Sequence, residues 1–177
     1  GNELKEVYKE IQMVFQDAIG SFNPRLTIEE SIMEYVCNLC STTEEEKKHK
    51  VDNLLQMVGL PKEYKDRYPH ELSGGQCQRA AIARALSAHP EILVCDEATS
   101  ALDVSVQAQV VELLKEMQEK MNISYLFITH DLALVSSFCD RVAVMKNGKV
   151  VEVGEAKEVI NNPQHEYTKL LIQSAYL

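Results

Sequence analysis

The sequence predicts an α/β fold in which helices cover both faces of a mostly parallel sheet and an all-helical segment is inserted. From residue 73 onward, apolar runs that suit strands alternate with segments of helical periodicity, which is the pattern of a parallel sheet. Residues 24 to 70 show only helical periodicity. We therefore expect a helical subdomain at 24–72, between two parts of the core at 1–23 and 73–177.

The composition excludes several classes of protein. Of 177 residues, 45% are hydrophobic and 25% are charged, which is typical of a globular chain large enough to form its own core. The formal net charge of -9 disfavours nucleic acid as the main partner, because the surface repels phosphate polymers. No apolar stretch is long enough to span a membrane, so we expect any membrane role to depend on a partner.

The first part of the chain predicts one strand and two helices. The strand is expected at Ile11–Phe15, before a loop that contains an Asn-Pro pair. Thr27, with a glutamate three residues later, has the spacing of a capping box and predicts the start of the first helix. The second helix is expected at Glu44–Val58, because a threonine precedes it and Gly59 follows it.

Helices and strands are expected to alternate in the rest of the chain. The continuous apolar run Ile92–Cys95 predicts a strand buried on both faces, and Ile123–Thr129 predicts another buried strand. Asp103 is placed to cap the helix between them, and Asn147-Gly148 suits a two-residue hairpin turn. The other expected elements are helices at Arg79–Ala88 and 131–138, strands at Arg141–Met145 and Lys149–Val153, and helical segments after Glu155 and His165.

Polar residues follow three of the predicted strands, at the sheet edge where open α/β proteins bind ligands. Asp96 and Glu97 follow one strand; one carboxylate can hold Mg²⁺ while the other orients or deprotonates a water. Gln16 follows another strand, and its amide can reach a metal ion or a water. His130 follows the third, where an imidazole can bind a terminal phosphate. Taken singly, each residue is equally consistent with a strand end, a loop or a helix start.

A glycine-rich segment, Leu72–Gln76, precedes a predicted helix. Gly74 and Gly75 let backbone N–H groups approach an oxyanion, the Ser73 hydroxyl adds a donor, and the helix N-terminus supplies positive potential. These properties suit a phosphate site. A plain turn with Ser73 as the N-cap would have the same sequence.

In this order and spacing, the segments resemble the nucleotide-binding subunit of ABC transporters. The resemblance covers nearly the whole chain and implies a P-loop NTPase-type fold. Residues 15–25 and 163–168 further resemble the ATPase subunits of dipeptide, oligopeptide and nickel importers. The matching motifs are Gln16 for the Q-loop, LSGGQ at 72–76 for the signature, ILVCDE at 92–97 for the Walker B strand, SALD at 100–103 for the D-loop and ITHD at 128–131 for the switch histidine.

The resemblance implies ATP and Mg²⁺ as cofactors. Asp96 and Gln16 would bind the metal, Glu97 would polarise water, and His130 with Gln16 would sense the γ-phosphate. The implied partners are a second ATP-binding subunit, identical or similar, and transmembrane permease subunits, which would hold the protein at the cytoplasmic side of the membrane. The residues expected to contact ATP held by the second subunit are Ser73, Gly74, Gly75, Gln76 and Asp103.

The phosphate-binding motif G-x-x-x-x-G-K-[ST], the Walker A loop, does not occur in the 177 residues. In the family this loop precedes the Q-loop, so we expect an N-terminally truncated subunit that is inactive alone. Lost strands would leave an unpaired sheet edge, which predicts self-association. Two other interpretations stay open: a soluble ABC ATPase that acts on DNA or ribosomes, and a non-catalytic fragment that donates its signature to a partner.

Five cysteines suit reduced thiols better than a disulfide framework. Cys95 lies in an apolar run, and Cys139 lies in a helix-like stretch, which suits buried thiols. Cys37 and Cys40 have the spacing of a redox or metal motif. Without a second pair or a nearby histidine cluster, we interpret them as thiols on one face of a helix.

Overall fold

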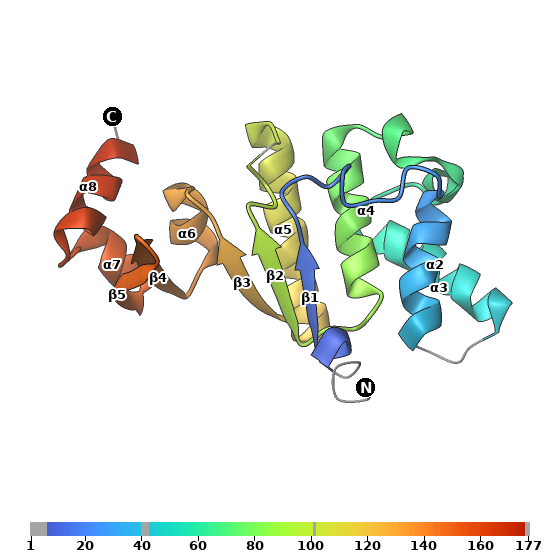
Figure 1. Ribbon diagram of the computed structural model, residues 1–177, viewed down its shortest axis with the longest axis horizontal. Helices are drawn as coiled ribbons and strands as arrows, with labels where there is room; N and C mark the ends of the chain where they lie inside the picture. Colours follow the sequence, from blue (N-terminus) through green and yellow to red (C-terminus); the bar gives the residue numbers. More distant parts are fainter. Residues whose placement is uncertain (1–6, 40–42, 101, 176–177) are drawn as a thin grey trace. The chain divides into compact units, whose positions relative to one another are not determined.

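Three parallel strands run through the first of two compact units. The computed structural model describes residues 7–39, 43–100 and 102–175, and the units are Gly1–Ile128 and Thr129–Leu177. The sheet has the order β1-β2-β3, with β2 in the centre (Figure 1). The strands are β1 (Ile11–Val14), β2 (Ile92–Asp96) and β3 (Ser124–Ile128). The predicted α/β fold with a parallel sheet is confirmed.

One face of this sheet is buried and the other is open. Leu93 and Cys95 of β2 are 0% and 1% exposed, whereas Ile92, on the opposite face, is 38% exposed. In β3, Leu126 and Ile128 are 55% and 48% exposed. The predictions that Ile92–Cys95 is buried on both faces and that Ile123–Thr129 is a buried strand are therefore wrong, because side chains alternate between the two faces of a strand and those on one face are exposed.

Two helices pack on the buried face. Helix α4 (Gly74–Leu86) contacts β1, and Tyr125 of β3 donates a hydrogen bond of 2.9 Å to Leu114 O of α5 (Val104–Met121). The first of these helices begins five residues earlier than the expected Arg79. Ser73 forms a capping box with Gln76, and this cap allows the two low-propensity glycines to form the first turn.

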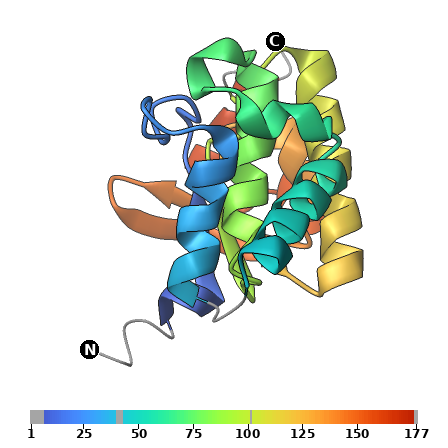
Figure 2. The ribbon, with the colours of Figure 1, turned by 90° about the vertical axis from the view of Figure 1, so that its right-hand side faces the viewer.

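Between residues 24 and 72 the described structure is helical. The helices α2 (Ile28–Leu39) and α3 (Glu44–Met57) pack on each other and on α4, which lies between them in Figure 2. The expected capping box at the start of α2 is present, since Thr27 Oγ1 accepts from Glu30 N at 3.2 Å and Thr27 N donates to Glu30 Oε2 at 2.8 Å. Two short 3₁₀ helices follow, η1 (Lys62–Asp66) and η2 (Pro69–Glu71).

In its described part, residues 129–175, the second unit contains a hairpin and three helices. Asn147 and Gly148 have φ values of 50° and 74°, which confirms the predicted two-residue turn between the antiparallel strands. Val135, Ala156 and Ile160 form its buried cluster. The elements are α6 (Leu132–Phe138), β4 (Arg141–Lys146), β5 (Lys149–Glu155), α7 (Ala156–Asn161) and α8 (Glu166–Ala175).

The described cysteines are unpaired thiols at Cys77, Cys95 and Cys139. Burial raises the pKa of Cys77 to about 11 and that of Cys95 to about 12, so both stay protonated at neutral pH. Cys40 and the side chain of Cys37 lie outside the described residues. Across the described ranges, no helix combines the length and the apolarity needed to cross a membrane.

Candidate functional site

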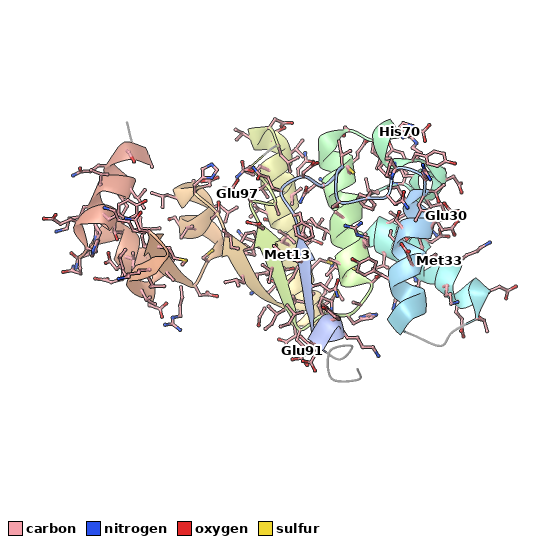
Figure 3. All side chains as sticks on the ribbon, viewed as in Figure 1. Met13, Glu30, Met33, His70, Glu91 and Glu97 are labelled. Carbon is pink, nitrogen blue, oxygen red and sulfur yellow. The ribbon has the colours of Figure 1, made fainter. Side chains whose placement is uncertain are left out.

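The acidic pair lies at the carboxyl end of the central strand. Asp96 is the last residue of β2, and Glu97 follows it at the end opposite Glu91 (Figure 3). Glu97 adopts a left-handed φ of 46°, which is unfavourable for a residue with a Cβ. Its N–H donates to Ile128 O at 2.9 Å, so the turn is fixed to the end of the neighbouring strand β3. Strain of this kind is concentrated at functional sites.

Gln16 is hydrogen-bonded into the turn that contains this pair. Its Nε2 donates to Ser100 Oγ at 3.2 Å, and Ser100 Oγ donates to Glu97 O at 2.9 Å. Gln16 lies just beyond β1, so the ends of two adjacent strands are joined through three side-chain and backbone groups. The structure therefore brings together Gln16, the first residue of SALD and the backbone of the acidic pair.

The N-terminus of α4 contains the serine and the two glycines. Ser73 Oγ accepts from Gln76 N at 3.4 Å, and Gln76 Oε1 accepts from Ser73 N at 3.0 Å. The capping box uses these two N–H groups, so those of Gly74 and Gly75 lie outside it. The Gln76 amide also donates to Tyr64 Oη of η1 at 3.3 Å, which gives this side chain a local structural role.

The two glycines have different surroundings. Among the described residues, no heavy atom lies within 4 Å of the position that a Cβ on Gly74 would take. A Cβ on Gly75 would lie 2.5 Å from Val106 Cγ1 of α5. Gly74 is therefore open to a ligand, whereas Gly75 is required by the packing of α4 against α5.

Asp103 caps α5, the helix whose Val106 packs against Gly75. Its Oδ1 accepts from Ser105 Oγ at 2.7 Å and from Val106 N at 3.0 Å, as predicted for an N-cap. The Ser105 hydroxyl, followed by the Val106 N–H, lowers the pKa of Asp103 below its usual value. The N-termini of α4 and α5 therefore meet at Gly75 and Val106.

His130 belongs to the second unit. It is exposed and follows Ile128 of β3 by two residues, immediately before Asp131, which caps α6 through N–H groups of Ala133 and Leu134. Within the described ranges, no group of three or more His, Cys, Asp or Glu side chains is arranged to hold a metal ion. A magnesium nucleotide needs only one or two carboxylates, because its phosphates supply further oxygen ligands, and Asp96 suits such a site.

The sequence reasoning missed Arg84 of α4. Its guanidinium donates to Ser21 O at 2.8 Å and to Ser21 Oγ at 2.9 Å, in the loop that follows Gln16. One signal was available: Arg84 is the only charged residue in an otherwise apolar run, Ala80–Leu86. Such a residue in a buried helix needs partners, although the sequence does not say where they are.

The fold and the arrangement of this site define the class of protein. A parallel sheet with an acidic pair at the carboxyl end of its central strand is typical of P-loop NTPases, which bind Mg²⁺ and nucleotide at this edge. Residues 1–100, more than half of the chain, match the family model described as ABC transporter, and the chain belongs to this family. The resemblance recognised from the motifs is thereby confirmed.

Curated relatives and solved structures agree with this assignment. The oligopeptide transport ATP-binding protein OppF of Bacillus subtilis is 49% identical over 173 residues, which are 97% of this chain and 57% of the relative. The structure of cbiO1 from Clostridium perfringens, described as part of the ABC transporter complex cbiONQ, has a TM-score of 0.81 at 34% identity and covers 91% of this chain and 63% of that one. The ATP-binding cassette MJ0796, in a dimeric state bound to ADP and Pi, has a TM-score of 0.76 at 30% identity and covers 88% and 66% of the two chains. The chain thus spans little more than half the length of the curated relative.

Proposed function

We propose that the chain is part of an ATP-binding subunit of an ABC transporter that couples ATP hydrolysis to the import of peptides or a related small solute. The observation that carries this proposal is the hydrogen-bonded link from Gln16 through Ser100 to the turn of the acidic pair. The proposed class of substrate is supported by the similarity to OppF, a protein named for oligopeptide transport.

The candidate site residues would divide the work of hydrolysis. Asp96 would hold Mg²⁺ through water, with Gln16 as a second oxygen ligand. Glu97 would orient and polarise the attacking water as a general base. His130 and Gln16 would register the γ-phosphate through hydrogen bonds. Bound ATP would supply the phosphoryl group and, with Mg²⁺, the charge that these side chains recognise.

The start of α4 fits a phosphate held by a second subunit. The open surface at Gly74 allows close approach, the N–H groups outside the capping box are donors, and the helix dipole favours negative charge. Ser73, Gly75, Gln76 and Asp103 would complete or support this surface. The dimeric state of the MJ0796 cassette supports a pair of subunits. Membrane attachment would come through permease subunits, with 24–72 as a helical subdomain between the core parts 1–23 and 73–177.

The 177-residue chain should neither bind ATP tightly nor hydrolyse it without a partner. It contains no Walker A motif, whose lysine and hydroxyl supply much of the charge neutralisation in phosphoryl transfer. The chain would instead donate its signature, at the N-terminus of α4, to ATP bound by another subunit. ATP-dependent association with a subunit that carries a Walker A motif is the expected activity.

A charge change at Ser73 tests this proposal. Ser73→Asp and Ser73→Asn both keep a good N-cap, but only the aspartate places negative charge where a phosphate would bind. We expect Ser73→Asp to weaken MgATP-dependent association with a Walker A-bearing ABC subunit by at least about tenfold, because like charges in close contact repel. Analytical ultracentrifugation with MgATP, and with ADP as the nucleotide control, measures the effect.

The matched variant decides the interpretation. Ser73→Asn keeps a neutral N-cap with a donor, so it should lose far less association in MgATP than Ser73→Asp does, and circular dichroism should show the wild-type helix content in both variants. Equal association by the two variants, or association that does not depend on ATP, would contradict a phosphate site at this helix start. Hydrolysis by the chain alone that disappears in Glu97→Gln would contradict the proposed inactivity.

The open face of the sheet supports self-association of the chain through a second copy. Ile92, Leu126 and Ile128 present apolar side chains on this face, and β1 and β3 are edge strands of the sheet in the described part of the chain. Burying such a face removes apolar surface from water. We expect the sedimentation coefficient to rise with protein concentration.

Two lysine substitutions, one on the open face and one elsewhere, test self-association. Leu126→Lys places a charge on the open face and should shift association to about tenfold higher concentration, because a charge would have to be buried. Val104→Lys changes an 83% exposed apolar residue on α5 and should have no effect. A wild-type chain that sediments as a monomer at every concentration would contradict self-association.

A further inference from the structure

A half-buried arginine links the helix that begins at the signature to the loop that follows Gln16. Arg84 lies on α4 and donates to both Ser21 O, at 2.8 Å, and Ser21 Oγ, at 2.9 Å. The two residues are 63 positions apart in the chain, so this is a tertiary contact between separate segments. A planar guanidinium that binds two acceptors of one residue fixes orientation as well as distance.

Aromatic rings enclose the same guanidinium. The Cζ of Arg84 lies 4.2 Å from the centroid of Phe22 and 5.5 Å from that of Tyr35 on α2. Phe22 is 4% exposed, so this part of the loop is anchored in the core. Burial lowers the pKa of Arg84, but an arginine stays charged at neutral pH. A charge held in such surroundings makes stronger hydrogen bonds than one in water.

The turn between Gln16 and Ser21 is closed by its own hydrogen bonds. Ser21 Oγ donates to Ala18 O at 2.7 Å, and Ser21 N donates to Asp17 O at 3.1 Å. Gly20 N donates to Asp17 Oδ1 at 2.9 Å. Asp17 is the next residue after Gln16, so this hydrogen-bonded turn connects Ser21 directly to Gln16.

We infer that Arg84 is a positioning residue for Gln16: it holds the loop at 17–22 in a fixed place on α4, and Gln16 thereby stays bonded to Ser100. The inference deepens the proposed function, on which the importance of Gln16 rests. It also gives α4 a means to move Gln16, because the helix that begins at the signature carries the donor. Coupling of this kind runs through a contiguous chain of packed and hydrogen-bonded groups.

The test measures the loop directly, without nucleotide. Arg84→Met keeps the length of the side chain and removes all donors. In the 177-residue chain we expect amide exchange at Ser21 and Phe22 to accelerate by about tenfold, since a charge-assisted hydrogen bond is lost. We also expect the side-chain amide signals of Gln16 to shift toward those of a solvated glutamine. Nuclear magnetic resonance of the isotope-labelled chain records both effects.

Arg79 provides a matched control on the same helix. Its guanidinium also binds two acceptors, Val58 O at 3.1 Å and Gln109 Oε1 at 2.8 Å, but neither belongs to the loop at 17–22. Arg79→Met should leave the exchange at Ser21 and the Gln16 signals unchanged. A folded Arg84→Met chain with wild-type exchange and Gln16 signals would overturn the inference, and so would equal effects of the two variants.

Ser21→Ala keeps the inference testable if Arg84→Met does not fold. This variant removes one acceptor and keeps the carbonyl, so we expect faster exchange at Phe22, by about threefold, and a smaller shift of the Gln16 signals. Unchanged Gln16 signals in Ser21→Ala would contradict positioning through this loop. The two tests are independent, because the nuclear magnetic resonance experiment contains no nucleotide. A negative result for Arg84 would not contradict ATP-dependent association, and a lack of association would not contradict the positioning of Gln16 by Arg84.

Discussion

Leu93→Ala is expected to lower the free energy of unfolding by about 3 kcal/mol, because it creates a cavity in the core. Leu93 is 0% exposed and lies in the central strand, on the face of the sheet that α4 and α5 cover. Urea unfolding followed by circular dichroism at low protein concentration measures the change, provided that the m-value is constant.

Ile92→Ala is the control for Leu93→Ala. Ile92 is on the same strand but on the open face, and it is 38% exposed. Ile92→Ala should therefore cost less than about 1 kcal/mol at low protein concentration. The same cost for both variants would show that the open face is covered in solution. A cost for Ile92→Ala that grows with protein concentration would indicate that a second copy covers it.

Gly75→Ala is expected to destabilise the chain by about 2 kcal/mol, since the new methyl group overpacks a filled site. Its Cβ would lie 2.5 Å from Val106 Cγ1, and a β-branched valine in a helix has little freedom to rotate away. Gly74→Ala adds the same methyl group at a position where the described neighbours leave room. The stability of this variant should therefore equal or slightly exceed that of the wild type. Thermal and urea unfolding of the two variants compare these outcomes.

Val106→Ala tests whether the contact with Val106 causes the loss of stability in Gly75→Ala. Val106→Ala should restore most of the stability of Gly75→Ala, because it removes the atoms in conflict, and the double-mutant cycle should show strong coupling. If Gly74→Ala cost as much as Gly75→Ala, or if Val106→Ala gave no rescue, the packing explanation would be wrong. The proposed phosphate site predicts the opposite order for ATP-dependent association. Gly74→Ala should weaken it more than Gly75→Ala does, because Gly74 is the glycine that remains accessible.

Local features were predictable from sequence because they depend on residues a few positions apart. The capping box at Thr27, the N-caps at Ser73 and Asp103 and the Asn147-Gly148 turn each satisfy backbone groups within one turn of their own segment. Helix α4 begins at Gly74 and not at the expected Arg79, because the Ser73–Gln76 capping box offsets the low helix propensity of the two glycines. The order of the motifs along the chain was enough to indicate the family.

The sequence by itself determined the strands, most helix boundaries and the residues that lie at the carboxyl edge of the sheet. Only the tertiary structure decided which face of the sheet is covered, which glycine packs against Val106 and which loop Arg84 holds. The physical reason is distance along the chain. Hydrogen bonds within a turn follow from neighbouring residues, whereas a contact across 63 residues exists only after helices and strands have packed.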